Sequence, residues 1–139
     1  MKATKILLVF VFSLLFQWSS AQYTLNLKID GVKSAEGNIL AAVYTSEDSF
    51  LKFDKVYKTS GSKAIEGTTQ IAIKDLPKGT YAVAIFHDEN GNNELDTNML
   101  GIPKEPIAFS KGKMKMFGPP DFKDCAFSLE SNSEIEISL

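Results

Sequence analysis

The chain has 139 residues and a formal net charge of −2, with 15 Lys, no Arg, 17 Asp or Glu, one His and one Cys. A mildly acidic chain without Arg lacks the basic surface that binds nucleic acid, so nucleic acid is excluded as a partner. Cys125 is the single Cys, which excludes an internal disulfide, so the fold must rest on its hydrophobic core.

The N-terminus predicts a secretory signal peptide over residues 1–21. Lys2 and Lys5 precede an apolar run at 6–16, and small residues follow as far as Ala21. The run is too short for a good membrane span, and no later apolar run is long enough to cross a bilayer. We therefore expect cleavage after Ala21 and a secreted or periplasmic protein without a membrane span.

Cleavage would leave one domain over residues 22–139. Removing 21 of the 139 residues leaves 118, a length typical of a single domain with a real core. Two Lys are lost with the signal peptide, so the net charge of the domain falls from −2 to −4.

The first half of the domain shows strand patterns separated by turn residues. Apolar and polar residues alternate at 23–29 and 69–73, and 56–60 is a shorter candidate strand. The stretch 39–44 is apolar on both parities, which predicts a central strand covered on both faces. A short helical turn is expected near 46–52, with Ser46 as its cap.

A strand beginning at Tyr81 follows a tight turn formed by Pro77 and Gly79. A Tyr at this position can pack its ring on the core and return its hydroxyl to the turn backbone, as in the tyrosine corner of sandwich domains. Alternation then places Tyr81, Val83 and Ile85 on one face of the strand, with the intervening residues on the other.

The second half predicts fewer regular elements. Prolines in 101–106 exclude a central strand, and alternating Lys at 111–115 indicates an edge strand whose charges block sheet-to-sheet pairing. The alternative for these Lys is a basic strip for acidic glycans or lipid headgroups. A strand at 125–129 and a hairpin turn at 130–133 lead to a last strand at 135–139. The whole pattern predicts an all-β fold, a single antiparallel β-sandwich of about seven strands.

Oxygen-bearing side chains crowd the segment 88–98, directly after the Tyr81 strand. From residue 79 to residue 103 there is no Lys to balance the acids, and alternate oxygen donors suit one hard cation. The sequence therefore predicts a Ca²⁺ site, with a solvated turn as the alternative. The predicted ligands are the side chains of Asp88, Asn90, Asn92 and Asp96 and the backbone carbonyl of Glu94, with Asn98 or Glu105 completing the shell.

The pattern departs from the standard calcium loop at two positions. Gly91 occupies the fourth loop position instead of the sixth, and Met99 stands at the twelfth, where a bidentate Glu is usual. These departures leave the cation shell incomplete unless a residue from outside the run contributes an oxygen.

His87 and Cys125 are the residues with the most reactive side chains. His87 is either a general base, a metal ligand, or a strand-end residue that hydrogen-bonds the acidic loop and orders it. Cys125 is either a nucleophile activated by His87 or a buried apolar thiol, and its parity with Phe127 and Leu129 favours burial.

Three functions are consistent with these residues. The first is a secreted non-enzymatic module stabilised by Ca²⁺, with an extracellular protein or glycan as its ligand. The second is a sandwich that binds a small molecule or glycan in a groove. The third is a hydrolase, which we rank last because no nucleophile elbow, zinc signature or phosphate-binding glycine loop is present, so no catalytic residue is assigned. For the second function, the residues expected to line the groove are His87, Phe109, Phe117 and Phe122.

Several short motifs lie between residues 76 and 127: LPKGTY at 76–81, FHDENGN at 86–92, LDTN at 95–98, GIPKE at 101–105, FGPPDFKD at 117–124 and the pair at 126–127. Together they resemble an exported bacterial family whose members carry a domain of unknown function, number 2141 (DUF2141). The resemblance implies a small secreted β-sandwich of the prealbumin or immunoglobulin-like kind, with no established biochemical activity.

Overall fold

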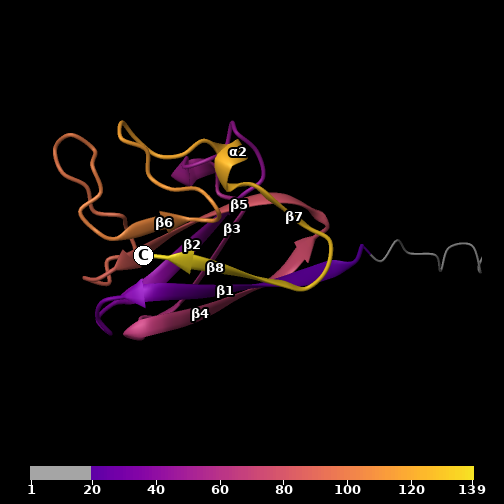
Figure 1. Ribbon diagram of the computed structural model, residues 1–139, viewed down its shortest axis with the longest axis horizontal. Helices are drawn as coiled ribbons and strands as arrows, with labels where there is room; N and C mark the ends of the chain where they lie inside the picture. Colours follow the sequence, from indigo (N-terminus) through magenta and orange to yellow (C-terminus); the bar gives the residue numbers. More distant parts are fainter. Residues whose placement is uncertain (1–19) are drawn as a thin grey trace, which may run out of the picture.

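Eight strands form two packed sheets in the computed structural model, which describes residues 20–139 (Figure 1). The predicted signal peptide therefore lies outside the described residues, apart from its last two positions. The strands are β1 (Gln22–Val32), β2 (Asn38–Tyr44), β3 (Lys58–Lys63), β4 (Gly67–Pro77), β5 (Gly79–Asp88), β6 (Ile107–Phe109), β7 (Phe127–Leu129) and β8 (Ser133–Ser138). The predicted all-β sandwich is confirmed.

The smaller sheet has the order β4-β1-β8, and the larger has the order β3-β2-β5-β6 with β7 paired to the start of β5. β1 pairs antiparallel with β4 but parallel with β8, which corrects the prediction of a purely antiparallel sandwich. The predicted hairpin at 130–133 is also wrong. The turn there carries the chain from one sheet to the other, so that Leu129 and Ile137 enter the same core from opposite sides.

The main core lies between the two sheets and is built from strand residues of a single parity. On β1 the alternating Leu25, Leu27 and Ile29 are fully buried, as their spacing predicts. On β5 the inward residues are Tyr81, Val83 and Ile85, again as predicted. This leaves the other parity of β2 and β5 on the outer face of the larger sheet.

The tyrosine corner is confirmed. The hydroxyl of Tyr81 donates a hydrogen bond of 2.7 Å to the carbonyl oxygen of Pro77, four residues upstream in the turn between β4 and β5. The ring is buried in the core, so the residue fixes the turn and fills the core at once.

The short turn predicted near 46–52 is present as hydrogen-bonded turns over 46–51, in which the Ser46 hydroxyl accepts from the backbone N–H of Ser49, and the 3-10 helix η1 (Phe53–Lys55) follows. Other local predictions need correction. The edge strand expected at 111–115 is absent from the described fold apart from one isolated bridge, because β6 pairs with β5 instead and buries Phe109. A one-turn helix α2 (Phe122–Cys125), with a capping box between Asp121 and Asp124, begins in the predicted rigid turn. Among the described residues, no helix is long and apolar enough to cross a membrane.

Candidate functional site: an apolar groove on the outer sheet face

The outer face of the larger sheet is apolar, and one half of it is covered by aromatic packing. Phe50, from the turns after β2, packs edge-on against Tyr44 and Phe122, with ring centroids 5.4 and 5.8 Å apart respectively. Phe109 of β6 lies 6.3 Å from the same ring. These aromatic rings belong to a hydrophobic cluster separate from the main core, and this outer-face cluster covers the end of the face that lies beneath α2.

The other half of the face is an open groove of about 780 Å³. Leu40 and Ala42 of β2 and Phe86 of β5 point to this side because they have the parity opposite to the core residues. The groove is closed laterally by two loop segments and by β3. The wall residues are Phe53, Val56, Thr59, Ser60, Gly61, Asn93, Glu94 and Leu95.

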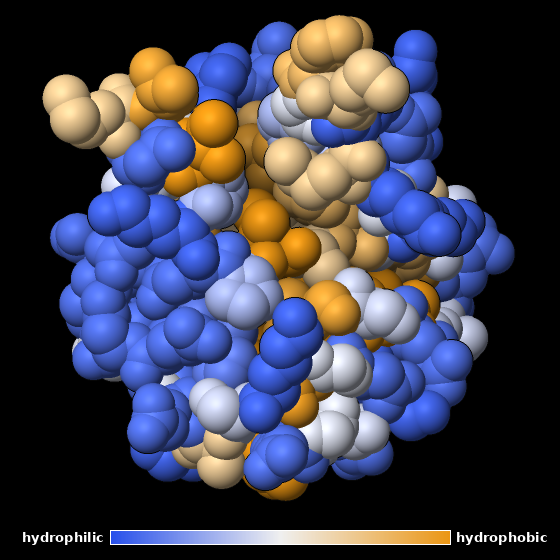
Figure 2. All heavy atoms as spheres, turned by 60° about the vertical axis from the view of Figure 1, so that its left-hand side comes forward, coloured by the Kyte–Doolittle hydropathy of each residue, from blue (hydrophilic) through white to orange (hydrophobic). Residues whose placement is uncertain are grey.

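A second pocket of about 180 Å³ continues the groove toward β6. The two share Ala42, Phe53, Phe86 and Leu95, so they form one continuous depression over the sheet. The remaining lining of the smaller pocket is almost wholly apolar. Its principal members are Tyr44, Leu51, Ala84, Ile107, Phe109, Gly101, Pro103, Met114 and Pro119. Figure 2 shows apolar surface running through the middle of this side of the molecule, with hydrophilic side chains flanking it.

The acidic loop forms one wall of the groove and is held by its own backbone. Asp88 is completely buried; its Oδ1 accepts hydrogen bonds from the backbone N–H groups of Gly91 and Asn92 at 2.9 and 3.1 Å, and its Oδ2 accepts from Asn93 at 2.9 Å. The backbone of Gly37 lies directly against the backbone of Asp88. Only glycine fits there, because a Cβ at position 37 would come within 1.8 Å of the Asp88 carbonyl oxygen.

Glu105 closes the base of the same loop. Its Oε1 accepts from the backbone N–H of Glu89 at 3.1 Å, and its Oε2 accepts from that of Asp96 at 3.0 Å. The carboxylate is buried, and two charge-assisted hydrogen bonds compensate for its removal from water. The sequence analysis predicts Glu105 as a ligand that completes a cation shell. In the structure its carboxylate connects the two ends of the loop through hydrogen bonds to Glu89 and Asp96.

The other predicted metal ligands hydrogen-bond one another or the loop backbone. The side-chain amides of Asn90 and Asn92 donate to the two carboxylate oxygens of Asp96, at 2.6 and 3.2 Å. Their amide oxygens accept from the backbone N–H groups of Asn92 and Glu94. Asn98 serves a separate turn, where it accepts from Leu100 and Ile102.

These contacts satisfy the loop without a cation. Within residues 20–139 no buried side-chain nitrogen or oxygen lacks a partner, and no three His, Cys, Asp or Glu side chains are grouped to hold a metal ion. The donor chemistry suits Ca²⁺, and the side-chain oxygens of Asp88, Asn90, Asn92 and Asp96 already accept hydrogen bonds within the loop. A cation would have to share these oxygens with the hydrogen-bond donors of the loop or displace them.

His87 and Cys125 lie on opposite faces of the larger sheet. His87 has the parity of the core residues, is buried, and lies with Nε2 2.7 Å from the carbonyl oxygen of Glu36. Because a carbonyl oxygen only accepts, Nε2 carries the proton. Cys125 packs in the outer-face cluster, where burial raises the pKa of its thiol. The sheet separates the two residues, so they cannot form a nucleophile–base pair.

Of the residues predicted to line a groove, Phe109 reaches the smaller pocket. Phe122 packs against Phe50, His87 faces the main core, and Phe117 projects into solvent at the tip of a loop. The groove floor was not predicted, although the double apolar parity of 39–44 indicates a strand with two buried faces. Leu95 carried a weaker signal, as the lone apolar residue of the acidic run.

The comparison with known families identifies the chain. Residues 27–137 match the family model DUF2141, described as an uncharacterized protein conserved in bacteria. The chain belongs to the DUF2141 family. No curated protein and no solved structure matches it.

The matched range shows which parts of this DUF2141 chain the family model covers. It begins within β1 and ends within β8, so it includes both sheets, the groove floor and the acidic loop that forms one wall. The groove is therefore part of the matched domain and not an addition outside it.

Proposed function

We propose that this DUF2141 chain is an exported, non-enzymatic binding module that receives the apolar part of a small molecule in the groove over its larger sheet. The observation that carries the proposal is the floor of Leu40, Ala42 and Phe86, which stays open while the rest of the same face is covered. A volume of about 780 Å³ lies in the range of small-molecule sites. Export rests on the sequence pattern of residues 1–21.

The distribution of polar groups favours a ligand with an apolar body and a polar head. Thr59, Asn93 and Glu94 are among the wall residues of the larger pocket, while the continuation toward β6 is almost wholly apolar. Glu94 forms no salt bridge among the described residues, so it is available to a cationic or hydrogen-bonding head group. A glycan would need a more polar lining than this groove offers, and we prefer an amphipathic ligand for that reason.

A non-enzymatic role is supported by the separation of the two residues that could have begun a reaction. His87 donates to the Glu36 carbonyl from within the core, and Cys125 lies across the sheet with a thiol pKa raised by burial. Neither residue lines the groove.

Filling the groove tests the proposal. The substitution Ala42→Trp puts an indole on the floor of both pockets, so binding of N-phenylnaphthylamine, a neutral apolar fluorophore, should weaken by about tenfold or more. Fluorescence titration of the unmodified chain and the variant measures the change. The matched control is Ala72→Trp, an exposed position on β4 in the other sheet, which should bind the fluorophore like the unmodified chain.

A second variant protects the test from a folding defect. Phe53 lines both pockets but is mostly exposed, so Phe53→Ser removes groove wall while leaving the core intact. It should also weaken fluorophore binding with little change in thermal unfolding. Equal affinity of all these variants would show that the groove does not receive the apolar probe.

The Ca²⁺ site stays a separate prediction. It is supported by the lack of any Lys partner for Asp88, Glu94, Asp96 or Glu105 among the salt bridges of the described residues. When bound, Ca²⁺ would neutralise this charge, with Asp88, Asn90, Asn92 and Asp96 as side-chain ligands and Glu94 as a carbonyl ligand.

Calorimetric titration of Ca²⁺ into metal-free protein tests the prediction. We expect heat of binding and a raised melting temperature, both reduced in Asp96→Asn and both unchanged in the control Glu66→Gln, an exposed acid in the β3–β4 turn. The prediction would be contradicted if millimolar Ca²⁺ produced neither heat of binding nor a change in melting temperature. This result would leave the groove proposal unaffected.

A further inference from the structure

Two neighbouring loops end in exposed apolar side chains, which we call the apolar tips: residues 99–102 and residues 114–117. Met99 is fully exposed, and Leu100, Met116 and Phe117 expose 83, 89 and 96 % of their surface. Six of the nine exposed large hydrophobic residues of the described chain belong to these two short segments. Apolar exposure of this density marks an interaction site more often than chance scatter does.

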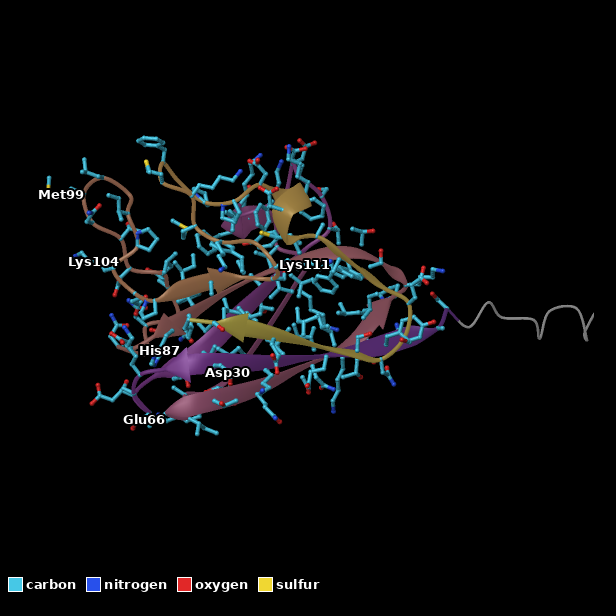
Figure 3. All side chains as sticks on the ribbon, in the orientation of Figure 1. Asp30, Glu66, His87, Met99, Lys104 and Lys111 are labelled. Atoms are coloured by element: carbon cyan, nitrogen blue, oxygen red, sulfur yellow. The ribbon has the colours of Figure 1, made fainter. Side chains whose placement is uncertain are left out.

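The two tips lie at the same end of the molecule. Both loops contribute to the smaller pocket, through Gly101 and Pro103 on one side and Met114 and Pro119 on the other. Figure 1 shows the two loops projecting together beyond β6. In Figure 3, Met99 and Lys104 lie at the upper left, while Glu66 and Asp30 lie lower in the view, away from the tips.

The two loops that carry the tips contain more Lys than acids, although the chain is acidic overall. Residues 97–120 contain four Lys and one acid, Glu105, in a chain whose net charge is −2. Glu105 is buried and hydrogen-bonded to the acidic loop. Lys104, Lys111 and Lys113 are exposed and make no salt bridge with any residue in 20–139, whereas Lys115 pairs with Asp121 and Asp124.

We propose that the apolar tips dock the protein onto the surface of an anionic phospholipid bilayer. Met, Leu and Phe side chains at the ends of narrow projections can enter between lipid headgroups, where their apolar surface is removed from water. The unpaired Lys104 and Lys113 of the same loops then contact headgroup phosphates, while their alkyl stems lie along the apolar boundary. The tips are two separate projections and not a continuous flat face, which suits a lipid surface better than a folded protein partner.

The arrangement connects docking to the groove. The tips flank the mouth of the smaller pocket, which continues into the larger groove. A docked molecule therefore brings the groove toward the bilayer, where an amphipathic molecule would be found. Docking itself depends on the tips and Lys alone, so it stands whether or not the groove receives a ligand.

Vesicle partitioning tests the proposal. The chain from Gln22 onward contains all eight strands, and it lacks the apolar run at 6–16 that could bind lipid by itself. We expect this chain to float with vesicles of mixed phosphatidylglycerol and phosphatidylcholine, and to bind more weakly as salt rises. Pure phosphatidylcholine vesicles should bind it less.

Matched variants separate the tips from the rest of the surface. The quadruple variant Met99→Ser, Leu100→Ser, Met116→Ser and Phe117→Ser should lose about tenfold or more of its partitioning. Ile65→Ser, which removes an exposed apolar side chain next to Glu66 and away from the tips, should lose none. Lys104→Glu with Lys113→Glu should weaken binding, and the control pair Lys33→Glu with Lys63→Glu should weaken it much less.

A fluorescent reporter shows insertion directly. The chain has one Trp, at position 18, which is absent from the chain beginning at Gln22. In Phe117→Trp the indole is therefore the sole Trp, and its emission should shift to shorter wavelength on mixed vesicles. Ala42→Trp, which blocks the groove, should still float with vesicles, so docking and groove binding fail independently.

The proposal is overturned if the chain does not partition into the mixed vesicles, or if the quadruple Ser variant partitions like the unmodified chain. Equal binding to vesicles with and without phosphatidylglycerol would overturn the role of the Lys. Binding of the tips to a protein from the same compartment, without binding to any vesicle, would also contradict docking on lipid.

Discussion

At the scale of a single residue, Tyr81 shows how one side chain can be assigned a role from its position alone. Tyr81→Phe removes the hydroxyl that donates to the Pro77 carbonyl at 2.7 Å and leaves that acceptor without its partner. We expect a loss of about 1 kcal/mol in the free energy of unfolding, seen as a fall of roughly 4 °C in melting temperature. Tyr57→Phe is the matched control. Its ring lies 6.0 Å from that of Tyr81, but its hydroxyl has no protein partner within the described chain, so stability should not change.

Asp88 shows the limit of the same reasoning. Its side chain was expected to bind Ca²⁺ because acids and amides alternate after it, and such residues also favour turns. In the structure three backbone N–H groups of the following residues supply its hydrogen bonds. The sequence shows which oxygens are present in a loop but not which backbone N–H groups of the fold will donate to them, and Ca²⁺ binding at Asp88 stays a prediction.

At the scale of elements, strands with alternating burial were predictable. The core residues of β1 and β4 follow from spacing, because one parity must be buried between two sheets, whereas β5 is buried on both faces. β3 was predicted two residues early, since KTSGSK has no apolar alternation and is held as a strand by pairing with β2. Three-residue β6 was missed because its pairing with β5 is decided by tertiary contact rather than by its own pattern.

The groove was less predictable than the strands that form its floor. Leu40, Ala42 and Phe86 can be assigned to an outer face from parity. Whether that face is open depends on where two long loops pack, and no period in the sequence encodes this. Phe50 covers one half and Phe53, three residues later, borders the open half. A shift of one loop would exchange covered and open surface, so only the fold locates the groove.

At the scale of the whole molecule, β8 joins the end of the chain to its beginning. It pairs parallel with β1, and Ile137 enters the core that β2 and β5 fill from the other sheet. The parallel pairing between β1 and β8 brings together residues that lie 108 positions apart in the sequence, such as Lys28 and Glu136, whose side chains are hydrogen-bonded. Because both sheets share one core, we expect them to unfold together as a single cooperative unit.

Ile137→Ala tests this cooperativity. The side chain is almost fully buried, so its truncation should lower the free energy of unfolding by about 3 kcal/mol. Native-state hydrogen exchange should report the same loss at the slowest amides of β1 and of β5, although β5 makes no backbone pairing with β8. Ser138→Ala, at the adjacent exposed position, should leave both sheets unchanged. If exchange accelerated in the smaller sheet alone, the sheets would be separate units, and β8 would stabilise only the sheet that contains it.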